Sequence, residues 1–102
     1  MPKFNLSILT PDGIVYENDV ESLIAPGANG FFGVLANHAP MIAATLPGVF
    51  KIKEDREIFF AVGGGMVEVS DGNVNFLADS AERADNADAA KSRALELASQ
   101  QH

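Results

Sequence analysis

The chain has 102 residues, 47% of them hydrophobic, which is enough for one compact domain with its own core. Seven basic and fourteen acidic residues give a net charge of −7, which argues against nucleic acid or an anionic lipid surface as the main partner. Without cysteine there are no disulfides and no zinc knuckles. Residues 1–5 resemble neither a signal peptide nor a transit peptide, and no apolar run is long enough to span a bilayer, so we expect a soluble, cytoplasmic, bacterial protein.

The first half of the chain has the pattern of short strands separated by glycine and proline turns. Apolar residues alternate over residues 3–9, which predicts a strand whose Phe4, Leu6 and Ile8 share one face. Pro11–Asp12–Gly13 predicts a turn, because proline fixes φ, aspartate bonds its own backbone and glycine supplies a left-handed position. The pattern then predicts strands at 14–16 and 20–25 around a bend at 17–19, a loop at 26–30, and strands at 31–35 and 41–46.

The strand pattern continues to residue 78. Asp71–Gly72 is the strongest hairpin signal in the chain, and Glu54–Asp55–Arg56 is a charged hairpin tip. Many short strands with intervening turns are typical of a sandwich or flattened barrel. The strands of this second part are predicted at 49–53, 57–62, 66–70 and 74–78.

A helix is predicted after the strands. Residues 85–101 contain no glycine, proline or β-branched residue, Asp85 or Asn86 is a suitable N-cap, and residues 79–82 are interpreted as a turn that approaches the helix. One face is rich in small residues, which implies shallow docking either on the sandwich or on a partner. That face consists of Ala87, Ala90, Ala94 and Ala98, flanked by Leu95 and Leu97.

The residues offer little for catalysis. His38 is the only histidine besides His102 and has no acidic neighbour in sequence, so a structural or interface role is favoured. The glycine run at 63–65 is followed by a strand pattern, which favours a tight bend over a phosphate loop. The basic residues at 51–56 are interspersed with acids, as in a solvated hairpin tip. We therefore expect no catalytic residue, metal or cofactor.

Adjacent aromatic residues point instead to an interaction surface. Phe31 and Phe32 must face opposite sides of an extended segment, so one of them lies outside the core. Together with Val34 and Met41–Ile42, the outer phenylalanine would form an apolar rim on one edge of a small domain. The residues alone leave two interpretations open: a contact surface, or the closed end of the barrel itself.

Five sequence blocks, in order and in register, resemble the epsilon subunit of F-type ATP synthases. One block alone would be a weak signal, whereas five in order are a strong one. The blocks are Thr10–Pro11–Asp12–Gly13, Gly30-x-Phe32–Gly33-x-Leu35-x-x-His38–Ala39–Pro40, Pro47–Gly48, Gly64–Gly65-x-Val67–Glu68–Val69 and Leu77–Ala78–Asp79–Ser80–Ala81–Glu82.

The resemblance implies a mainly β protein: a flattened β-sandwich of about ten strands over residues 1–84, followed by a single helix in residues 85–102. It also implies a non-catalytic rotor subunit that couples the gamma subunit to the c-ring during proton-driven ATP synthesis, peripherally at the cytoplasmic face of a bacterial energy-coupling membrane. The C-terminal helix would contact the alpha and beta subunits. The c-ring contact is carried over to Ala28, Asn29, Gly30, Phe31, Phe32 and Gly33, and the gamma contact to His38, Ala39, Pro40, Met41, Ile42 and Ala43.

The sequence departs from the family pattern in two regions. Phe31 stands where the family commonly has glutamate, and residues 85–102 suffice for one helix, whereas the family typically ends in an inhibitory helical hairpin. We therefore expect a short form with reduced or absent inhibition. The family's nucleotide-binding pattern survives in degenerate form as Asp88 and Lys91, which predicts weak or absent ATP binding because lysine lacks the planar fork of arginine. The alternative function is a stand-alone nucleotide-sensing module in which sandwich and helix clasp a nucleotide.

Overall fold

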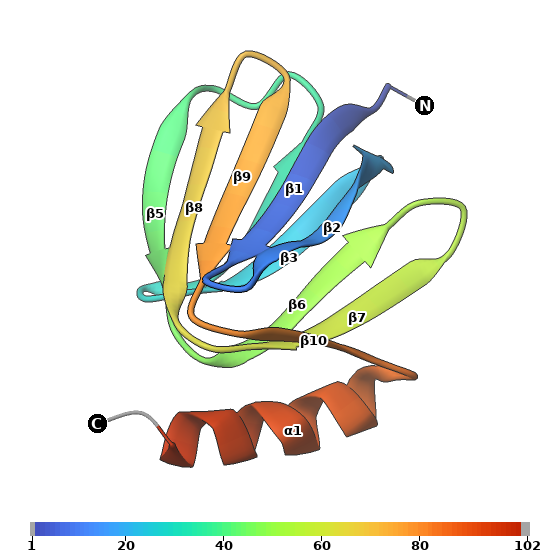
Figure 1. The fold of residues 1–102 in the computed structure, drawn as a ribbon. Helices are drawn as coiled ribbons and strands as arrows, with labels where there is room; N and C mark the ends of the chain where they lie inside the picture. The colour runs from blue at the N-terminus through green and yellow to red at the C-terminus, as the bar shows by residue number, and fades with distance from the viewer. Residues whose placement is uncertain (1, 101–102) are drawn as a thin grey trace.

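The structure of the protein is a computed structural model, which describes residues 2–100 (Figure 1). The chain begins with β1 (Phe4–Thr10), β2 (Gly13–Val20), β3 (Ser22–Gly27), β4 (Gly30–Leu35) and β5 (Met41–Thr45). It continues with β6 (Gly48–Lys53), β7 (Glu57–Val62), β8 (Gly65–Ser70), β9 (Asn73–Ala78), β10 (Ala81–Ala84) and helix α1 (Ala87–Ser99). The described residues thus confirm a mainly β fold with one C-terminal helix.

The strands form one sheet that folds over into two layers (Figure 1). Neighbouring strands follow the order β10-β7-β6-β3-β5-β8-β9-β1-β2, and β4 pairs with β3 outside this path. Strands β1 and β9 are parallel, which places the first and the ninth strand side by side. One layer contains β5, β8, β9, β1 and β2, and the opposite layer contains β3, β6, β7 and β10. The result is the expected flattened β-sandwich.

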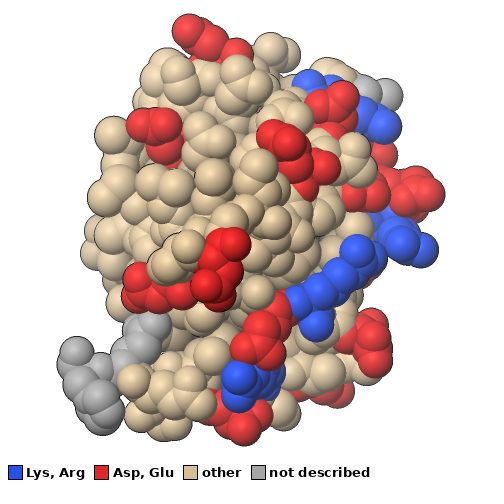
Figure 2. All heavy atoms as spheres, in the orientation of Figure 1, with Lys and Arg blue, Asp and Glu red and all other residues tan. Residues whose placement is uncertain are grey.

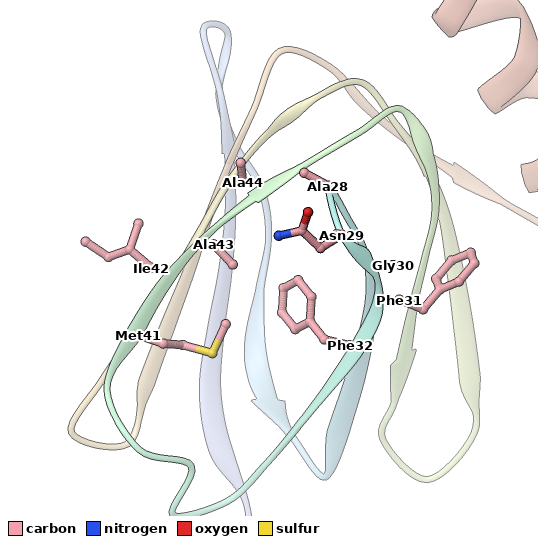
Figure 3. Close-up of a pocket in the computed structure, with 10 residues that line it drawn as sticks. Ala28, Asn29, Gly30, Phe31, Phe32, Met41, Ile42, Ala43 and Ala44 are labelled. Atoms are coloured by element: carbon pink, nitrogen blue, oxygen red, sulfur yellow. The ribbon is translucent and has the colours of Figure 1, made fainter.

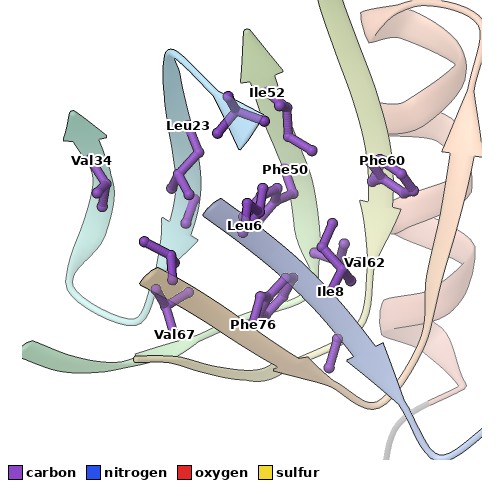
Figure 4. Close-up of a cluster of buried hydrophobic side chains, with 14 of the residues drawn as sticks. Leu6, Ile8, Leu23, Val34, Phe50, Ile52, Phe60, Val62, Val67 and Phe76 are labelled. Carbon is purple, nitrogen blue, oxygen red and sulfur yellow. The ribbon is translucent and has the colours of Figure 1, made fainter. Parts of the chain in front are cut away.

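The hydrophobic core lies between the two layers and consists of side chains at alternate strand positions (Figure 4). In β1, Phe4, Leu6 and Ile8 are buried, as their alternation predicted. Phe50 of β6 stacks on Phe76 of β9, with ring centroids 4.6 Å apart. This aromatic pair joins the two layers directly.

Strand β2 is continuous, which corrects the expected bend at residues 17–19. Its ladder with β1 runs through that segment, where Glu17 pairs with Ser7 and Asp19 with Asn5. The Ser7 hydroxyl donates a hydrogen bond to the Glu17 carboxylate at 2.8 Å. Glutamate, asparagine and aspartate are poor strand formers, so only the pairing with β1 reveals the strand. The chain bends at Glu21 instead, just before β3.

Strand β10 corrects the expectation of a helix-approaching turn at residues 79–82. Ala81 pairs with Val62 of β7, and the ladder continues to the end of β10. The strand has four residues, and its central Glu82 and Arg83 are exposed, so it shows no apolar alternation. Backbone pairing to the edge of β7 forms this strand, with little side-chain burial.

Side chains connect β2, at one end of the strand path, to the β6–β7 hairpin near the other end. Tyr16 in β2 donates a hydrogen bond to Glu54 at the β6–β7 turn, and Asn18 donates to the same carboxylate at 3.0 Å. The Tyr16 ring packs edge-on against Phe60 of β7, with centroids 5.7 Å apart. Burial, reinforced by the bond to Glu54, raises the pKa of the Tyr16 hydroxyl above its ordinary value. These contacts close the seam between β2 and the β6–β7 hairpin.

Helix α1 packs on the outer face of β6, β7 and β10 (Figure 1). Asn86 caps its N-terminus, as expected, by accepting a hydrogen bond from the Ala89 N–H. The Arg93 guanidinium donates two hydrogen bonds to the Glu82 carboxylate of β10, at 3.0 and 2.8 Å. This bidentate pair lowers the pKa of Glu82 and fastens the helix to the sheet. Within residues 2–100, no helix has the length and apolar character that a bilayer crossing requires.

The buried side of α1 agrees only in part with the predicted alanine face. Ala90 and Ala94 are buried, as expected. Ala87 and Ala98 are exposed, however, and Leu97 is buried. Ala94 and Leu97 pack together with Ala61 of β7. The alanine pattern does not fix the rotation of the helix about its axis, so the contact with the sheet decides which side is buried.

Candidate protein-interaction surfaces

The β3–β4 hairpin forms one end of the sandwich and carries the residues expected to contact the c-ring (Figure 1). Its turn consists of Ala28 and Asn29 alone, because β3 continues to Gly27 and β4 begins at Gly30. A Cβ at position 27 would lie 2.5 Å from the Gly30 carbonyl oxygen, and Gly30 itself has a φ of 117°. Both positions therefore require glycine, and the hairpin is tighter than the loop predicted at 26–30.

Phe31 and Phe32 point to opposite faces of β4, as predicted (Figure 3). Phe32 packs half-buried against the core, whereas Phe31 is 73% exposed. Val34 faces the same way as Phe32 and is fully buried, so the expectation that it belongs to the exposed rim is wrong. The outward apolar side chains of β4 are Phe31 and Leu35.

A cavity of about 420 Å³ opens between β4, which pairs with β3, and β5, which pairs with β8 (Figure 3). Phe32 and Met41 point toward its interior, while Phe31 and Ile42 point away on opposite sides. The structure thus places residues 28–32 of the expected c-ring contact next to residues 41–43 of the expected gamma contact. The lining residues are Gly27, Ala28, Asn29, Gly30, Phe31, Phe32, Met41, Ile42, Ala43 and Ala44.

His38, Ala39 and Pro40, the other residues of the expected gamma contact, lie in the connection from β4 to β5 and outside the cavity lining. The His38 backbone N–H donates to the Leu35 carbonyl at 3.2 Å, and its Nδ1 lies 2.7 Å from the Ala39 carbonyl oxygen. Asn37 adopts a left-handed φ of 67° just before it. These contacts are local, which suits a structural or interface histidine.

A row of apolar side chains crosses the outer face of the layer that contains β5, β8, β9, β1 and β2. Ile14 is 62% exposed, and Met66 and Leu77 are also exposed. In Figure 2 much of this side of the molecule is uncharged surface with isolated acidic side chains, and basic side chains gather along its right side. The members of this row are ladder partners in successive strands, and we call it the apolar row. It consists of Ala44, Met66, Leu77, Leu9 and Ile14.

The apolar row escaped the sequence analysis, although the sequence contains a signal for it. Strands of the row carry two apolar residues in succession, for example at Ile8–Leu9, Met66–Val67 and Phe76–Leu77. Adjacent strand residues face opposite sides, so each such pair makes both faces of its strand apolar. Phe31–Phe32 is the same signal, and there it did predict an exposed aromatic residue.

The glycine run at residues 63–65 forms the bend between β7 and β8. A Cβ at position 65 would lie 2.0 Å from the Leu77 carbonyl oxygen, so β8 and β9 approach too closely for any side chain at this position. This confirms the predicted tight bend between packed strands. Among residues 2–100, no three His, Asp or Glu side chains are grouped in a way that would hold a metal ion.

Asp88 and Lys91, expected as a degenerate nucleotide contact, lie in different surroundings. Asp88 is exposed in the first turn of α1. Lys91 lines a groove between α1 and the start of β6, and every other residue that lines this groove is apolar or glycine. The groove therefore contributes no second polar side chain that would face a phosphate beside Lys91.

Comparison with known proteins matches residues 3–84 to the family described as ATP synthase, delta/epsilon chain, beta-sandwich domain. The ATP synthase epsilon chain of Leptospira borgpetersenii is 42% identical over 78 residues, which are 76% of this chain and 61% of the relative. The epsilon chain of Pelotomaculum thermopropionicum is 43% identical over 90 residues, which are 87% of this chain and 67% of the relative. The chain thus spans 61% of the length of the first curated relatives.

Solved structures share the fold. A chain of the Euglena gracilis mitochondrial ATP synthase, in a structure with OSCP, F1 and the c-ring, superposes with a TM-score of 0.76 at 22% identity, over 81% of this chain and 55% of that chain. A chain of the Tetrahymena thermophila central stalk and c-ring has a TM-score of 0.70 at 18% identity, over 79% of this chain and 66% of that chain. Because the family match extends over residues 3–84 and the bacterial relatives exceed 40% identity, the chain belongs to the delta/epsilon family of ATP synthase subunits.

Proposed function

We propose that the chain is a non-catalytic rotor subunit in the central stalk of an F-type ATP synthase, where it couples the gamma subunit to the c-ring during proton-driven ATP synthesis. Family membership and the named relatives support this role. The observation that carries it is the presence of two exposed apolar surfaces that face different ways on one small sandwich: the β3–β4 hairpin with Phe31, and the apolar row. Such surfaces on a small domain usually mark contacts with partners, and two of them suit two partners.

The hairpin is the proposed contact with the c-ring, through residues 28–33. Its two-residue turn is closed by the pairing of Gly27 with Gly30 at the end of the β3–β4 ladder, so the tip loses little conformational entropy when it binds. Phe31 projects from this rigid support with most of its ring exposed. Residues 28–30 are also exposed and uncharged, which suits a close approach of backbone to a neighbouring loop.

The proposed gamma contact starts at His38–Ala43 and extends onto the apolar row. Ile42 is exposed and points away from the cavity (Figure 3). Two residues further along β5, Ala44 faces the same side and is the first member of the apolar row. The expected contact and the apolar row therefore form one continuous outer surface, on the layer opposite to α1.

This arrangement would hold the subunit peripherally at the cytoplasmic face of a bacterial energy-coupling membrane, by way of the c-ring. Helix α1 covers the other layer of the sandwich, where it is available to the alpha and beta subunits. Since Asp88 and Lys91 share no polar cavity, we expect ATP binding by this helix to be weak or absent.

Gel filtration of the chain with the gamma-containing catalytic complex of its own synthase tests the proposal. We expect co-elution at micromolar concentration, lost in Leu77→Glu because a carboxylate cannot be buried in an apolar contact without a large desolvation cost. Ala89→Glu is the control, because Ala89 is exposed on α1, which covers the layer opposite to the apolar row. If the wild-type chain does not co-elute, the rotor function is wrong. Saturable heat in a calorimetric titration with ATP would support the nucleotide-sensing alternative instead.

A further inference from the structure

A groove of about 350 Å³ runs between α1 and the sheet. A cavity of roughly 150 Å³ accommodates a benzene molecule, so this groove has room for a large side chain together with part of its backbone. Leu95 is 67% exposed on the helix side. The side chains that line the groove are Phe31, Pro47, Val49, Lys91, Leu95 and Ala98, together with the buried Ala94.

The groove is continuous with the β3–β4 hairpin. Phe31 lines both this groove and the cavity between β4 and β5, so the two hollows adjoin at this residue. Pro47 brings the β5–β6 connection to the same place. A partner that covers Phe31 at the end of the sandwich therefore also reaches the mouth of the groove, whereas a partner on the apolar row is separated from α1 by the thickness of the sandwich.

Lys91 gives the groove a charge preference. It is the only charged residue in the lining, and no carboxylate within residues 2–100 forms an ion pair with it. An ammonium group beside an apolar surface favours a partner segment that presents a carboxylate next to an apolar side chain, because the carboxylate is then paired as water is displaced.

We infer, on the basis of the proposed function, that α1 is part of the c-ring contact. The groove receives an apolar side chain from the same ring loop that covers Phe31, and Lys91 pairs with a carboxylate of that loop. Helix α1 thus has two roles: Ala90, Ala94 and Leu97 pack toward the sandwich, while Leu95 and Lys91 face the ring.

Binding of the 102-residue chain to the purified c-ring of its own synthase, in detergent micelles, tests this inference. Leu95→Glu is expected to weaken binding about tenfold, the effect of losing one well-packed interface side chain, and Phe31→Glu at least as much. Lys91→Glu should weaken binding and Lys91→Arg should preserve it. Ala89→Glu is the control, because Ala89 is exposed on α1 but does not line the groove. All variants should retain wild-type circular dichroism and gamma binding.

A second measurement avoids any concern about folding. The chain has no cysteine, so Leu95→Cys and Ala89→Cys each introduce a unique thiol. The ring should slow maleimide labelling of Leu95→Cys several-fold and leave labelling of Ala89→Cys unchanged.

The outcomes separate this inference from the proposed function. If Phe31→Glu loses the ring while Leu95→Glu binds like the wild-type chain and Leu95→Cys labels at the free rate, the helix contact is wrong and the rotor function stands. If the wild-type chain binds no ring, both are wrong. Dimers of the free chain that Leu95→Glu disrupts would assign the groove to a second copy, and protection of Leu95→Cys by ATP would assign it to a nucleotide; either result overturns the ring contact.

Discussion

The sandwich and the helix of this protein are stabilised in different ways. In the sandwich, large side chains from both layers fill a continuous core, and Phe50 stacks on Phe76 across it. In contrast, α1 buries two alanines and one leucine and is fastened by the Arg93–Glu82 pair. A small contact of this kind opens at a lower free energy than the core does. The two parts of this protein can therefore differ in stability: the sandwich forms a rigid body, whereas the strength of helix docking can change without affecting the sandwich core.

The largest effect is expected in the sandwich core. Phe50→Ala should lower the free energy of unfolding by about 3–5 kcal/mol, because it removes the buried ring that joins the two layers. Phe31→Ala, the matched exposed phenylalanine, should change it by less than about 0.5 kcal/mol. Urea denaturation followed by circular dichroism measures both. Equal losses in the two variants would contradict the assignment of Phe50 to the core and Phe31 to the surface.

The second-largest loss of stability is expected where the backbones of β8 and β9 lie in close contact. Gly65→Ala should destabilise the protein by about 1–3 kcal/mol, because the new methyl group would lie 2.0 Å from the Leu77 carbonyl oxygen and force β8 and β9 apart. Gly33→Ala is the control, since its Cβ would meet the Leu23 carbonyl oxygen at an ordinary 3.6 Å. The same urea experiment compares the two, and an unchanged midpoint in Gly65→Ala would show that the strands do not approach this closely.

Helix variants should act locally. Leu97→Ala should weaken docking of α1 by roughly 2 kcal/mol, the low end for a buried leucine, because the site is shallow. Hydrogen exchange should accelerate in the α1 amides while those of β1 and β9 keep their protection. Leu95→Ala, at the exposed neighbouring leucine, should leave both unchanged. A matching loss of protection in the strands would mean that helix and sandwich unfold as one unit.

The smallest effect is expected from acid. The Arg93 guanidinium holds the pKa of Glu82 below its ordinary 4.5, so the contribution of this pair is complete above that pH and is lost as pH falls through the lowered pKa. The NMR signal of the Arg93 Nε–H should shift over that acidic range, and Glu82→Gln should reduce the shift, because the carboxylate that accepts the Nε–H bond is then absent. Because the pair lies at the surface, salt should weaken it. A signal that shifts only near neutral pH would rule out Glu82 as the titrating group.

Local signals in the sequence predicted the parts of the fold that depend on neighbouring residues. Asp71–Gly72 forms the expected hairpin turn, with left-handed φ values of 43° and 81°. The alternation at Phe4, Leu6 and Ile8 identified the core side of β1. Asn86 was one of two N-caps that fitted the pattern, and its side chain makes the capping bond.

The remaining features depend on residues that are distant in the sequence. Strand β10 forms because the edge of β7 is available to it, and Glu17 stays in β2 because Ser7 lies opposite. The apolar row exists because β1 lies beside β9, which brings Leu9 next to Leu77. No window of consecutive residues contains that pairing. The proposed contacts at residues 28–33 and 38–43 came from the family resemblance, and the structure supplied the cavity between the first set and residues 41–43.

The hydrogen bond from Tyr16 to Glu54 has a mechanical consequence for the rotor role proposed for this chain. A sheet that folds over without closing twists easily, because the strands on the two sides of its open seam can slide past each other. Tyr16 on β2 and Glu54 at the β6–β7 turn lie on the two sides of this seam, and their hydrogen bond opposes that sliding. In the rotor role proposed above, in which two neighbours hold the subunit at two places, a body closed in this way would turn as a whole, with little angular lag between its ends.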